Sequence, residues 1–172
     1  MIRLAIHGGA GTILRSSMTA ELQQQYEQGL QDALQAGYSV LQGGGSAVDA
    51  VQAAVVSLED FPLFNAGRGS VFNNTGGHEM DASIMDGKTI DAGAVSGIRN
   101  VKNPVLLART IMDKSEHVLL CGQGAEQFAK QQGLQFEDDA YFYVQHRYEQ
   151  WQQALKEDSI SLDHNDKKFG TV

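Results

Sequence analysis

The chain has 172 residues, of which 13 are Lys or Arg and 21 are Asp or Glu, so its formal net charge is -8. This length suits a single domain with its own core, and the negative charge, without a basic stripe, argues against nucleic acid as a partner. The N-terminal apolar stretch is too short for a signal peptide and no later stretch approaches a membrane span, so we expect a cytoplasmic protein that does not bind membranes.

The first forty residues predict a strand, a loop and a helix. The apolar run 2–7 ends in glycines, which is typical of a buried first strand followed by a glycine loop over 7–12. From Thr19 to Leu41, apolar residues recur every three or four positions and glycines follow. An amphipathic helix of several turns is therefore expected there.

A second helix is expected over 46–60, because Ser46 and Asp49 form a variant of the capping box and the apolar residues lie on one face. Residues 61–72 follow neither the helical nor the strand period, and glycines recur at alternate positions around Arg68. This stretch is predicted to be a loop of defined shape.

The clearest β signal lies between residues 78 and 98. Apolar residues alternate in its first half, Asp86 and Gly87 provide a hairpin turn, and a second strand of small residues returns. Further elements are expected in chain order: a helix opened by Asn103 as cap and Pro104 as first residue and ending near Ser115, a strand over 117–121, and helices over 124–133 and 143–155.

Residues 157–169 are polar, highly charged and poor in apolar side chains, which predicts a flexible linker. Strands and helices mix along residues 1–156, and the hairpin argues against an all-parallel sheet. We therefore expect one domain of the α+β class. Its single cysteine, Cys121, excludes an internal disulfide, agrees with a reducing compartment and is predicted to be a buried strand thiol rather than a nucleophile.

Two glycine-rich loops follow predicted strands, but neither has the full signature of a nucleotide site. The loop 7–12 can present backbone amides to an anion but lacks the Lys-Ser/Thr pair of a phosphate-binding loop. The loop 121–126 lacks the third glycine and the acid of a dinucleotide fingerprint. We expect no organic cofactor, and a small-molecule binding module built on the loop 7–12 is an alternative function.

Histidine and acid patterns do not predict a metal site or a catalytic triad. His78, Glu79 and Asp81 lie on a predicted strand, where adjacent residues point to opposite faces and cannot converge on one ion. No histidine stands in a pattern from which a serine-histidine-acid arrangement can be read.

Asn65 is the polar amide of the apolar loop 61–72, so it is expected to be buried and to have hydrogen-bond partners. Such an amide can donate to a developing oxyanion, or it can hold the backbone of its own loop. The glycines around Arg68 indicate tight curvature, which allows backbone carbonyls to converge on a cation.

The sequence stops at Thr171 and Val172, two β-branched residues that suit the start of a strand, directly after Gly170. Two interpretations are open for this pair. Either the chain is interrupted at an arbitrary point, or Gly170 and Thr171 form a processing junction at which a threonine becomes an amino terminus and serves as its own base.

Six stretches together resemble a known family. They are IHGGAG at 6–11, PLFNAGRGSVF at 62–72, HEMDASIMDG at 78–87, AGAVSGI at 92–98, NPVLLAR at 103–109 and GTV at 170–172. In this order they resemble the plant-type asparaginases, also called isoaspartyl peptidases, which are N-terminal nucleophile hydrolases.

The resemblance implies a fold and an assembly. The fold would be an αββα four-layer sandwich, completed by a β subunit from the same precursor. Residues 1–156 would be the α-subunit part of that single domain, 157–169 the linker, and 170–172 the autocleavage junction with the start of the β subunit. A dimer of αβ units, a heterotetramer, is implied as the assembly.

The resemblance also implies an activity, with Thr171 and Asn65 as catalytic residues. The precursor would cleave itself between Gly170 and Thr171, and the enzyme would hydrolyse the small substrates L-asparagine and β-aspartyl dipeptides through a threonine acyl-enzyme. Cleavage turns the Thr171 amide into an α-amine with a pKa of about 7.7 to 8.0, and this amine can accept the proton of the Thr171 hydroxyl. A glycosylasparaginase-like hydrolase is the alternative within the superfamily.

A structural alkali cation, sodium or potassium, is a further implication of the resemblance. A weakly charged ion with oxygen ligands is a better match than a divalent ion, because few carboxylates are near. The alternative is that backbone amides and water satisfy the same carbonyls. The ligating backbone carbonyls would be those of Leu58, Glu59, Phe61, Phe64, Ala66 and Arg68.

Overall fold

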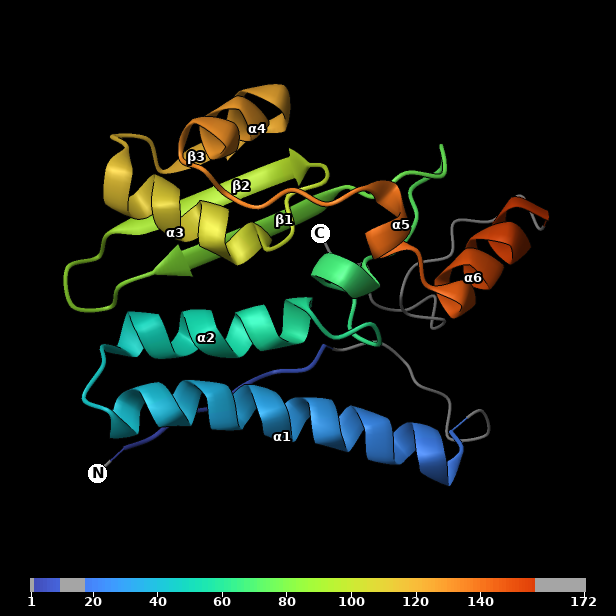
Figure 1. Ribbon diagram of the computed structural model, residues 1–172, viewed down its shortest axis with the longest axis horizontal. Coiled ribbons are helices and arrows are strands. Elements are labelled where there is room, and N and C mark those ends of the chain that lie inside the picture. The colour runs from blue at the N-terminus through green and yellow to red at the C-terminus, as the bar shows by residue number, and fades with distance from the viewer. Residues whose placement is uncertain (1, 10–17, 157–172) are drawn as a thin grey trace.

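The computed structural model describes residues 2–9 and 18–156, in which helices are layered on one side of a small sheet (Figure 1). The helices are α1 (Ala20–Gln42), α2 (Ala47–Glu59), α3 (Pro104–Lys114), α4 (Gly122–Gln131), α5 (Asp139–Phe142) and α6 (Gln145–Lys156), and a 3-10 turn, η2, spans Gly67–Gly69. The strands are β1 (Met80–Met85), β2 (Ala92–Ile98) and β3 (Leu119–Cys121). A fold that mixes helices and strands, as expected from the sequence, is confirmed.

The strands lie in the order β1-β2-β3. β1 and β2 are antiparallel, with Ile84 opposite Gly93, whereas β2 and β3 are parallel. The predicted hairpin is therefore confirmed, although its connection, 86–91, is longer than a two-residue turn. In that connection the Asp86 carboxylate accepts a hydrogen bond from the Lys88 N–H at 2.8 Å.

The core lies between the sheet and α3. Gly93 allows the two to approach closely, because a Cβ at this position would lie 2.1 Å from the Ala108 carbonyl oxygen of α3. The core side chains are apolar and almost fully buried: they include Val95, Ile98, Val105, Leu107 and Ile111. Burial of this cluster is the main apolar contribution to the stability of the sheet layer.

Both N-terminal helices begin as the sequence predicts. The Thr19 hydroxyl accepts a hydrogen bond from the Leu22 N–H at 3.1 Å, and the Ser46 hydroxyl accepts one from the Asp49 N–H at 3.1 Å. Each bond satisfies an amide that would otherwise lack a partner in the first helical turn.

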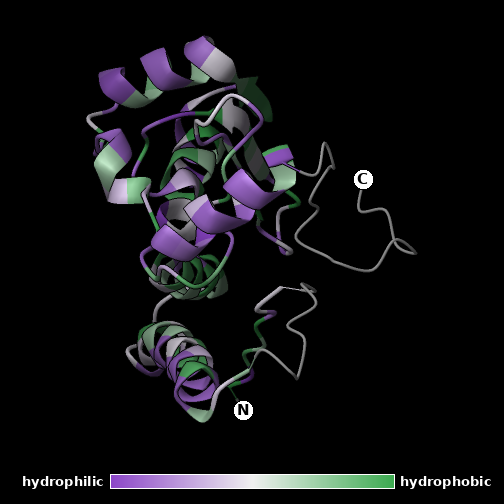
Figure 2. Cartoon of the chain, turned by 90° about the vertical axis from the view of Figure 1, so that its right-hand side faces the viewer, coloured by the Kyte–Doolittle hydropathy of each residue, from purple (hydrophilic) through white to green (hydrophobic). Residues whose placement is uncertain are grey.

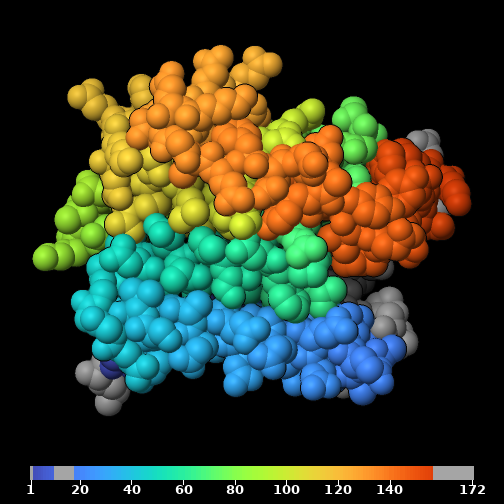
Figure 3. All heavy atoms as spheres, viewed as in Figure 1, coloured from blue at the N-terminus to red at the C-terminus, as the bar shows by residue number. Residues whose placement is uncertain are grey.

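Small residues bring α1 and α2 together. Gly29, Ala33 and Gly37 are buried at every fourth position of α1, and a Cβ on Gly37 would lie 2.7 Å from the Ala50 carbonyl oxygen of α2. The backbones therefore pack closely. In Figure 3, α1 lies at the lower edge of the molecule and α2 lies between α1 and the rest of the chain. This pair supports the loop that follows α2.

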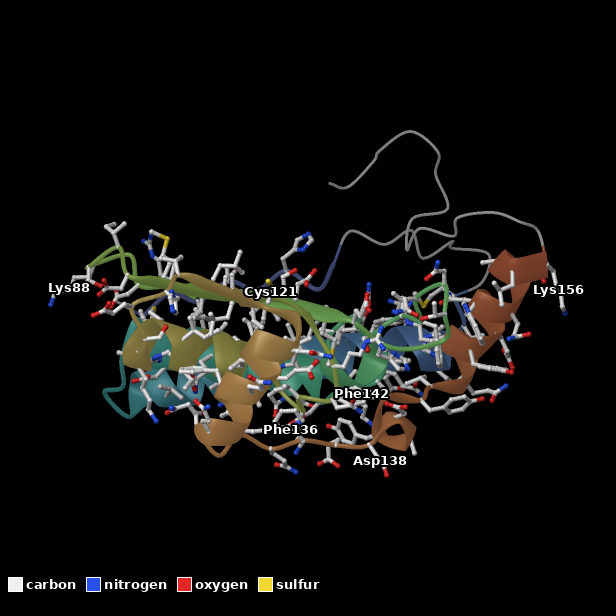
Figure 4. All side chains as sticks on the ribbon, turned by 90° about the horizontal axis from the view of Figure 1, so that it is seen from above. Lys88, Cys121, Phe136, Asp138, Phe142 and Lys156 are labelled. Carbon is white, nitrogen blue, oxygen red and sulfur yellow. The ribbon has the colours of Figure 1, made fainter. Side chains whose placement is uncertain are left out.

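The sheet is covered on one face only by the described residues. Seen from above, the helices lie on one side of the sheet, and side chains on its other side point away from them (Figure 4). Exposure alternates along β1, where Asp81, Ser83 and Met85 are exposed, and Leu119 of β3 is 56% exposed. A sheet face that carries such apolar side chains normally packs against another layer.

At the C-terminal end of the described chain, α6 is amphipathic. Its hydrophilic residues face the viewer in Figure 2, whereas Trp151 stacks on Phe72 with ring centroids 5.5 Å apart and Tyr148 meets the same ring edge-on. These aromatic contacts attach α6 to the segment after η2. No helix of the described part is both long enough and apolar enough to cross a membrane.

Two expectations are wrong for the described chain. Residues 2–9 form no strand, because no described strand lies beside them to complete a ladder; Leu4 instead packs near Gly37 of α1. Cys121 is exposed rather than buried, because it lies on the open face of the sheet.

Candidate active site

The loop that follows α2 is anchored by aromatic side chains. Phe64 is buried, and its ring centroid lies 5.7 Å from that of Tyr26 on α1 and 5.6 Å from that of Phe61. The Tyr26 hydroxyl also donates to the Leu63 carbonyl at 3.4 Å. The loop is therefore held against α1 immediately before Asn65.

Asn65 is exposed in the described chain, which corrects the expectation that it is buried. Its side-chain oxygen, Oδ1, accepts a hydrogen bond from the Val71 N–H at 3.0 Å. An N–H can only donate, so this contact fixes which end of the amide is oxygen. The Nδ2 group makes no hydrogen bond to any described residue, and its two N–H donors are available to another group.

Gly67 and Gly69 let the loop fold back on the end of α2. Gly67 has a φ of 50°, and a Cβ there would lie 2.4 Å from the Glu59 carbonyl oxygen. A Cβ on Gly69 would lie 2.1 Å from the Phe64 carbonyl oxygen and 2.6 Å from that of Pro62. Carbonyl oxygens thus face the inside of the loop, where only glycine leaves room.

The six carbonyls named from the sequence fall into two groups. Three accept hydrogen bonds from backbone amides within the loop: those of Leu58, Phe64 and Ala66. Three accept none from any described residue: those of Glu59, Phe61 and Arg68. A carbonyl oxygen has two lone pairs, so the first group can also take a second partner. All six are uncharged oxygen atoms, the type of ligand that a hard cation accepts.

The Glu59 side chain joins the end of α2 to the start of α3. It is 3% exposed, and its Oε1 accepts a hydrogen bond from the Val105 N–H at 2.9 Å. Burial is the largest influence and raises the pKa of this carboxyl to about 8, while the bond from Val105 opposes the shift. The other oxygen, Oε2, is buried without a hydrogen-bond partner in the described chain.

The first turn of α3 is capped by Glu59 and not by Asn103, which the sequence predicts as its cap. Asn103 precedes α3, but its side chain makes no capping bond and donates instead to the Asp60 carboxylate at 3.1 Å. The Tyr141 hydroxyl donates to the same Asp60 oxygen at 3.2 Å, and burial together with Asp60 raises the pKa of Tyr141 to about 12. The end of α2 is thus fixed by neighbours from α3 and α5.

Arg68 lies beside this network without an ion pair to it. Its guanidinium carbon lies 5.5 Å from the centroid of the Tyr141 ring, a cation–π distance. The arginine side chain therefore packs on α5, and its carbonyl accepts no hydrogen bond from any described residue.

His78 and Ser70 form a buried pair next to the same loop. The Nδ1 atom of His78 lies 3.1 Å from both the hydroxyl and the carbonyl oxygen of Ser70. A carbonyl only accepts, so Nδ1 carries the hydrogen and cannot be a base for the hydroxyl. Burial is the main cause that lowers the pKa of His78, which favours the neutral ring. The pair is therefore structural and not a nucleophile with its base.

Glu79 and Asp81 have hydrogen-bond and ion-pair partners within the described chain. Glu79 pairs with Arg99, and the Asp81 carboxylate accepts from the Ser96 hydroxyl at 2.8 Å and from the Gly97 N–H at 2.7 Å. In residues 2–9 and 18–156 there is no group of three His, Cys, Asp or Glu side chains that could hold a metal ion.

The remaining predicted site residues, Gly170 and Thr171, and the linker 157–169 lie outside the described residues. The structure therefore brings together Asn65 and the carbonyl loop, but it does not relate them to Thr171. Sequence reasoning missed the Glu59 carboxyl and the His78–Ser70 pair. The burial of Glu59 could have been inferred from its position, because it lies four residues after Val55 on the apolar face of α2.

Comparison with known proteins gives a family. The family model described as asparaginase matches residues 1–172. An isoaspartyl peptidase of Salmonella typhimurium is 46% identical over 175 residues, which cover 98% of this chain and 56% of that protein. A putative isoaspartyl peptidase/L-asparaginase of Dictyostelium discoideum is 44% identical, covering 94% of this chain and 47% of that protein.

A third relative is named plant-type L-asparaginase. The plant-type L-asparaginase of Thermococcus kodakarensis is 46% identical over 156 residues, which cover 91% of this chain and 48% of that protein. The chain thus spans about half the length of the curated relatives it matches.

Proposed function

The chain belongs to the asparaginase family, and from this premise we propose that it is the N-terminal half of an amidohydrolase that cleaves its own precursor between Gly170 and Thr171. The cleaved enzyme hydrolyses L-asparagine and β-aspartyl dipeptides. The observation that carries the proposal is the 44 to 46% identity, over nearly the whole chain, to proteins named isoaspartyl peptidase and plant-type L-asparaginase.

Thr171 is the proposed nucleophile. Before cleavage its nitrogen is an amide without useful basicity, and afterwards it is an α-amine that can accept the proton of its own hydroxyl. During processing the hydroxyl attacks the Gly170 carbonyl, and the Gly170 acyl group passes from the Thr171 nitrogen to the Thr171 oxygen as the peptide bond breaks. During turnover the hydroxyl attacks the substrate's side-chain amide or β-peptide carbonyl, and the C–N bond breaks to release ammonia or the amine, which takes the proton held by the α-amine. Water then hydrolyses the resulting acyl-enzyme.

Asn65 is the proposed amide donor of the site. Its Oδ1 is engaged by the Val71 N–H, so its Nδ2 is left to donate. A donor of this kind lowers the barrier if it points to the position where negative charge develops, or if it orients the nucleophile. The aromatic anchoring of the loop supports this role, because a donor must be preorganised to act in the transition state.

We also propose that a sodium or potassium ion stabilises the loop, held by the backbone carbonyls of Leu58, Glu59, Phe61, Phe64, Ala66 and Arg68. The inward carbonyls around Gly67 and Gly69, and the carbonyls without hydrogen bonds in the described chain, support it. When bound, the ion would be coordinated by these uncharged oxygens and would fix the backbone on either side of Asn65.

The four-layer αββα sandwich belongs to the same proposal. The open face of the sheet, with Met85 and Leu119 more than half exposed, supports a second sheet that comes from the C-terminal half of the precursor. That half would then cover Cys121 and pair with residues 2–7. A dimer of such αβ units is the proposed assembly, and the single cysteine agrees with a reducing compartment such as the cytoplasm.

The activity is tested with the full gene product, purified after processing. Ammonia release from L-asparagine and aspartate release from a β-aspartyl dipeptide should both be measurable, with Thr171→Ala as an inactive control. A correctly processed protein that hydrolyses neither substrate would contradict the proposed function.

The cation is tested on the same protein in choline chloride, with NaCl or KCl added at equal ionic strength. Binding to the folded state should raise the melting temperature by mass action, and activity should rise in parallel. Equal melting temperature and activity in all three salts would contradict the cation site.

A further inference from the structure

Asn65 is positioned by a contact with residue 71, six residues further along the chain. The Val71 N–H that binds Oδ1 belongs to the peptide whose carbonyl is that of Ser70. The direction of that N–H therefore depends on how the backbone of Ser70 is held. A small rotation of this peptide would move the Asn65 amide with it.

The backbone of Ser70 is held by His78. Ser70 is 3% exposed and His78 is 8% exposed, and the imidazole Nδ1–H reaches the Ser70 carbonyl oxygen at 3.1 Å. The Ser70 hydroxyl lies at the same distance from Nδ1. The single Nδ1–H group thus binds both oxygens of the residue whose peptide carries the Val71 N–H.

The imidazole itself cannot turn freely. Its ring centroid lies 4.3 Å from that of Phe72 and 6.0 Å from that of Phe142 of α5, and Phe72 in turn stacks on Trp151 of α6. His78 lies two residues before β1, which begins at Met80. The ring therefore links the sheet and the C-terminal helices to the backbone beside Asn65.

We propose that His78 is a positioning residue for Asn65, acting through the Ser70–Val71 peptide. The catalytic consequence of this inference rests on the proposed function. The contacts that carry it do not depend on the substrate: Nδ1–H of His78 binds the Ser70 carbonyl, and the N–H of the same peptide binds Asn65 Oδ1. We call this chain of contacts the relay. The role requires the Nδ1–H donor and not a titrating base, because both the neutral and the protonated ring can donate from Nδ1.

Two substitutions separate the donor from the aromatic packing. His78→Phe keeps a ring in the aromatic cluster but has no donor. His78→Asn removes the ring but places an amide N–H close to where Nδ1–H lies. Both are made in the full precursor, and the melting temperature, kcat, KM and rate of self-cleavage are compared with the wild type.

For His78→Phe we expect a melting temperature that falls less than in His78→Asn, because the ring packing is kept although the buried Ser70 carbonyl loses its donor. Its kcat should be lowered roughly tenfold with KM nearly unchanged, because misplacing a catalytic group mainly affects the transition state. For His78→Asn we expect a lower melting temperature but a kcat close to that of the wild type. A residue with a purely structural role would show the opposite order, with activity following stability.

A double variant and a structure complete the test. In an Asn65→Ala background, His78→Phe should cause little further loss of kcat, because both changes act on the same amide. A crystal structure of His78→Phe should show the bond between Asn65 Oδ1 and Val71 N lengthened or lost. Full kcat in His78→Phe, or loss of kcat in His78→Asn to the level of His78→Phe, would overturn the inference.

The failure of the inference and that of the proposed function can be distinguished. If the wild type is active and Asn65→Ala is slow, the proposed function stands, and a fully active His78→Phe overturns only the role of His78. If the wild type hydrolyses neither substrate, the proposed function fails, and the crystal structure of His78→Phe alone decides the relay: an unchanged Asn65–Val71 bond overturns it.

Discussion

The side-chain oxygen of Asn65 accepts a hydrogen bond from the backbone N–H of Val71 at 3.0 Å. This single contact orients the amide and leaves its Nδ2 group without a partner in the described chain. A loop-holding role uses the oxygen, whereas a catalytic role uses the nitrogen. The two roles can therefore be tested separately.

Asn65→Asp keeps an oxygen for the Val71 N–H but removes the Nδ2 donor, and Asn65→Ala removes both. Loss of one oriented donor typically costs about 2.7 to 4 kcal/mol in the barrier, so both variants should turn over asparagine roughly a hundredfold or more slowly. Steady-state kinetics measures this. If Asn65→Asp works at nearly the wild-type rate, the residue only holds its loop.

Gly67→Ala should destabilise the protein because its φ of 50° is unfavourable for alanine and its Cβ would lie 2.4 Å from the Glu59 carbonyl oxygen. We expect a loss of at least about 1 to 2 kcal/mol in the free energy of unfolding. Urea denaturation of the processed enzyme measures it. Gly87→Ala is the matched control, since a Cβ there meets nothing within 4 Å. Equal stability of the two variants would contradict the loop geometry.

Glu59→Gln should be tolerated, whereas Glu59→Ala should not. The glutamine oxygen can still accept the Val105 N–H, but alanine leaves this amide of α3 without its partner and leaves a space at the junction of α2 and α3. An unsatisfied buried amide costs about 1 to 3 kcal/mol. Thermal unfolding at pH 7 should thus place Glu59→Gln near the wild type and Glu59→Ala well below it; the reverse order would contradict a capping role.

Stability should depend on the protonation of His78. Burial lowers its pKa in the folded state, while hydrogen bonds to the Ser70 and Val71 backbone and the charge of Asp139 oppose the shift. The stability that the neutral ring contributes is therefore present above the usual pKa near 6.5 and is lost as the pH falls through the lowered value. The stability difference between wild type and His78→Asn should shrink below pH 6.5. A difference that grows toward acid would mean that the pKa is raised.

Local patterns were sufficient for much of the fold. The periodicity of apolar residues located α1 and α2, and Ser46 caps α2 as expected. Alternation and turn residues located the hairpin of β1 and β2. These features depend on neighbours within a few residues, which is why the sequence alone predicts them.

Contacts between distant residues account for what the sequence did not predict. Residues 2–7 have strand composition but no strand beside them in the described chain, and Cys121 has an apolar context but lies on an open sheet face. Glu59 and Val105 are 46 residues apart, so no local pattern indicates that one caps the helix of the other. The burial of a residue is set by what packs on it, and packing partners are distant in the sequence.

Self-cleavage is tested by the intact mass of the full gene product after purification without protease. We expect two polypeptides whose masses place the break between Gly170 and Thr171, and a single uncleaved chain for Thr171→Ala. A wild-type protein that stays in one piece, or a Thr171→Ala variant that breaks at the same bond, would contradict self-cleavage by Thr171.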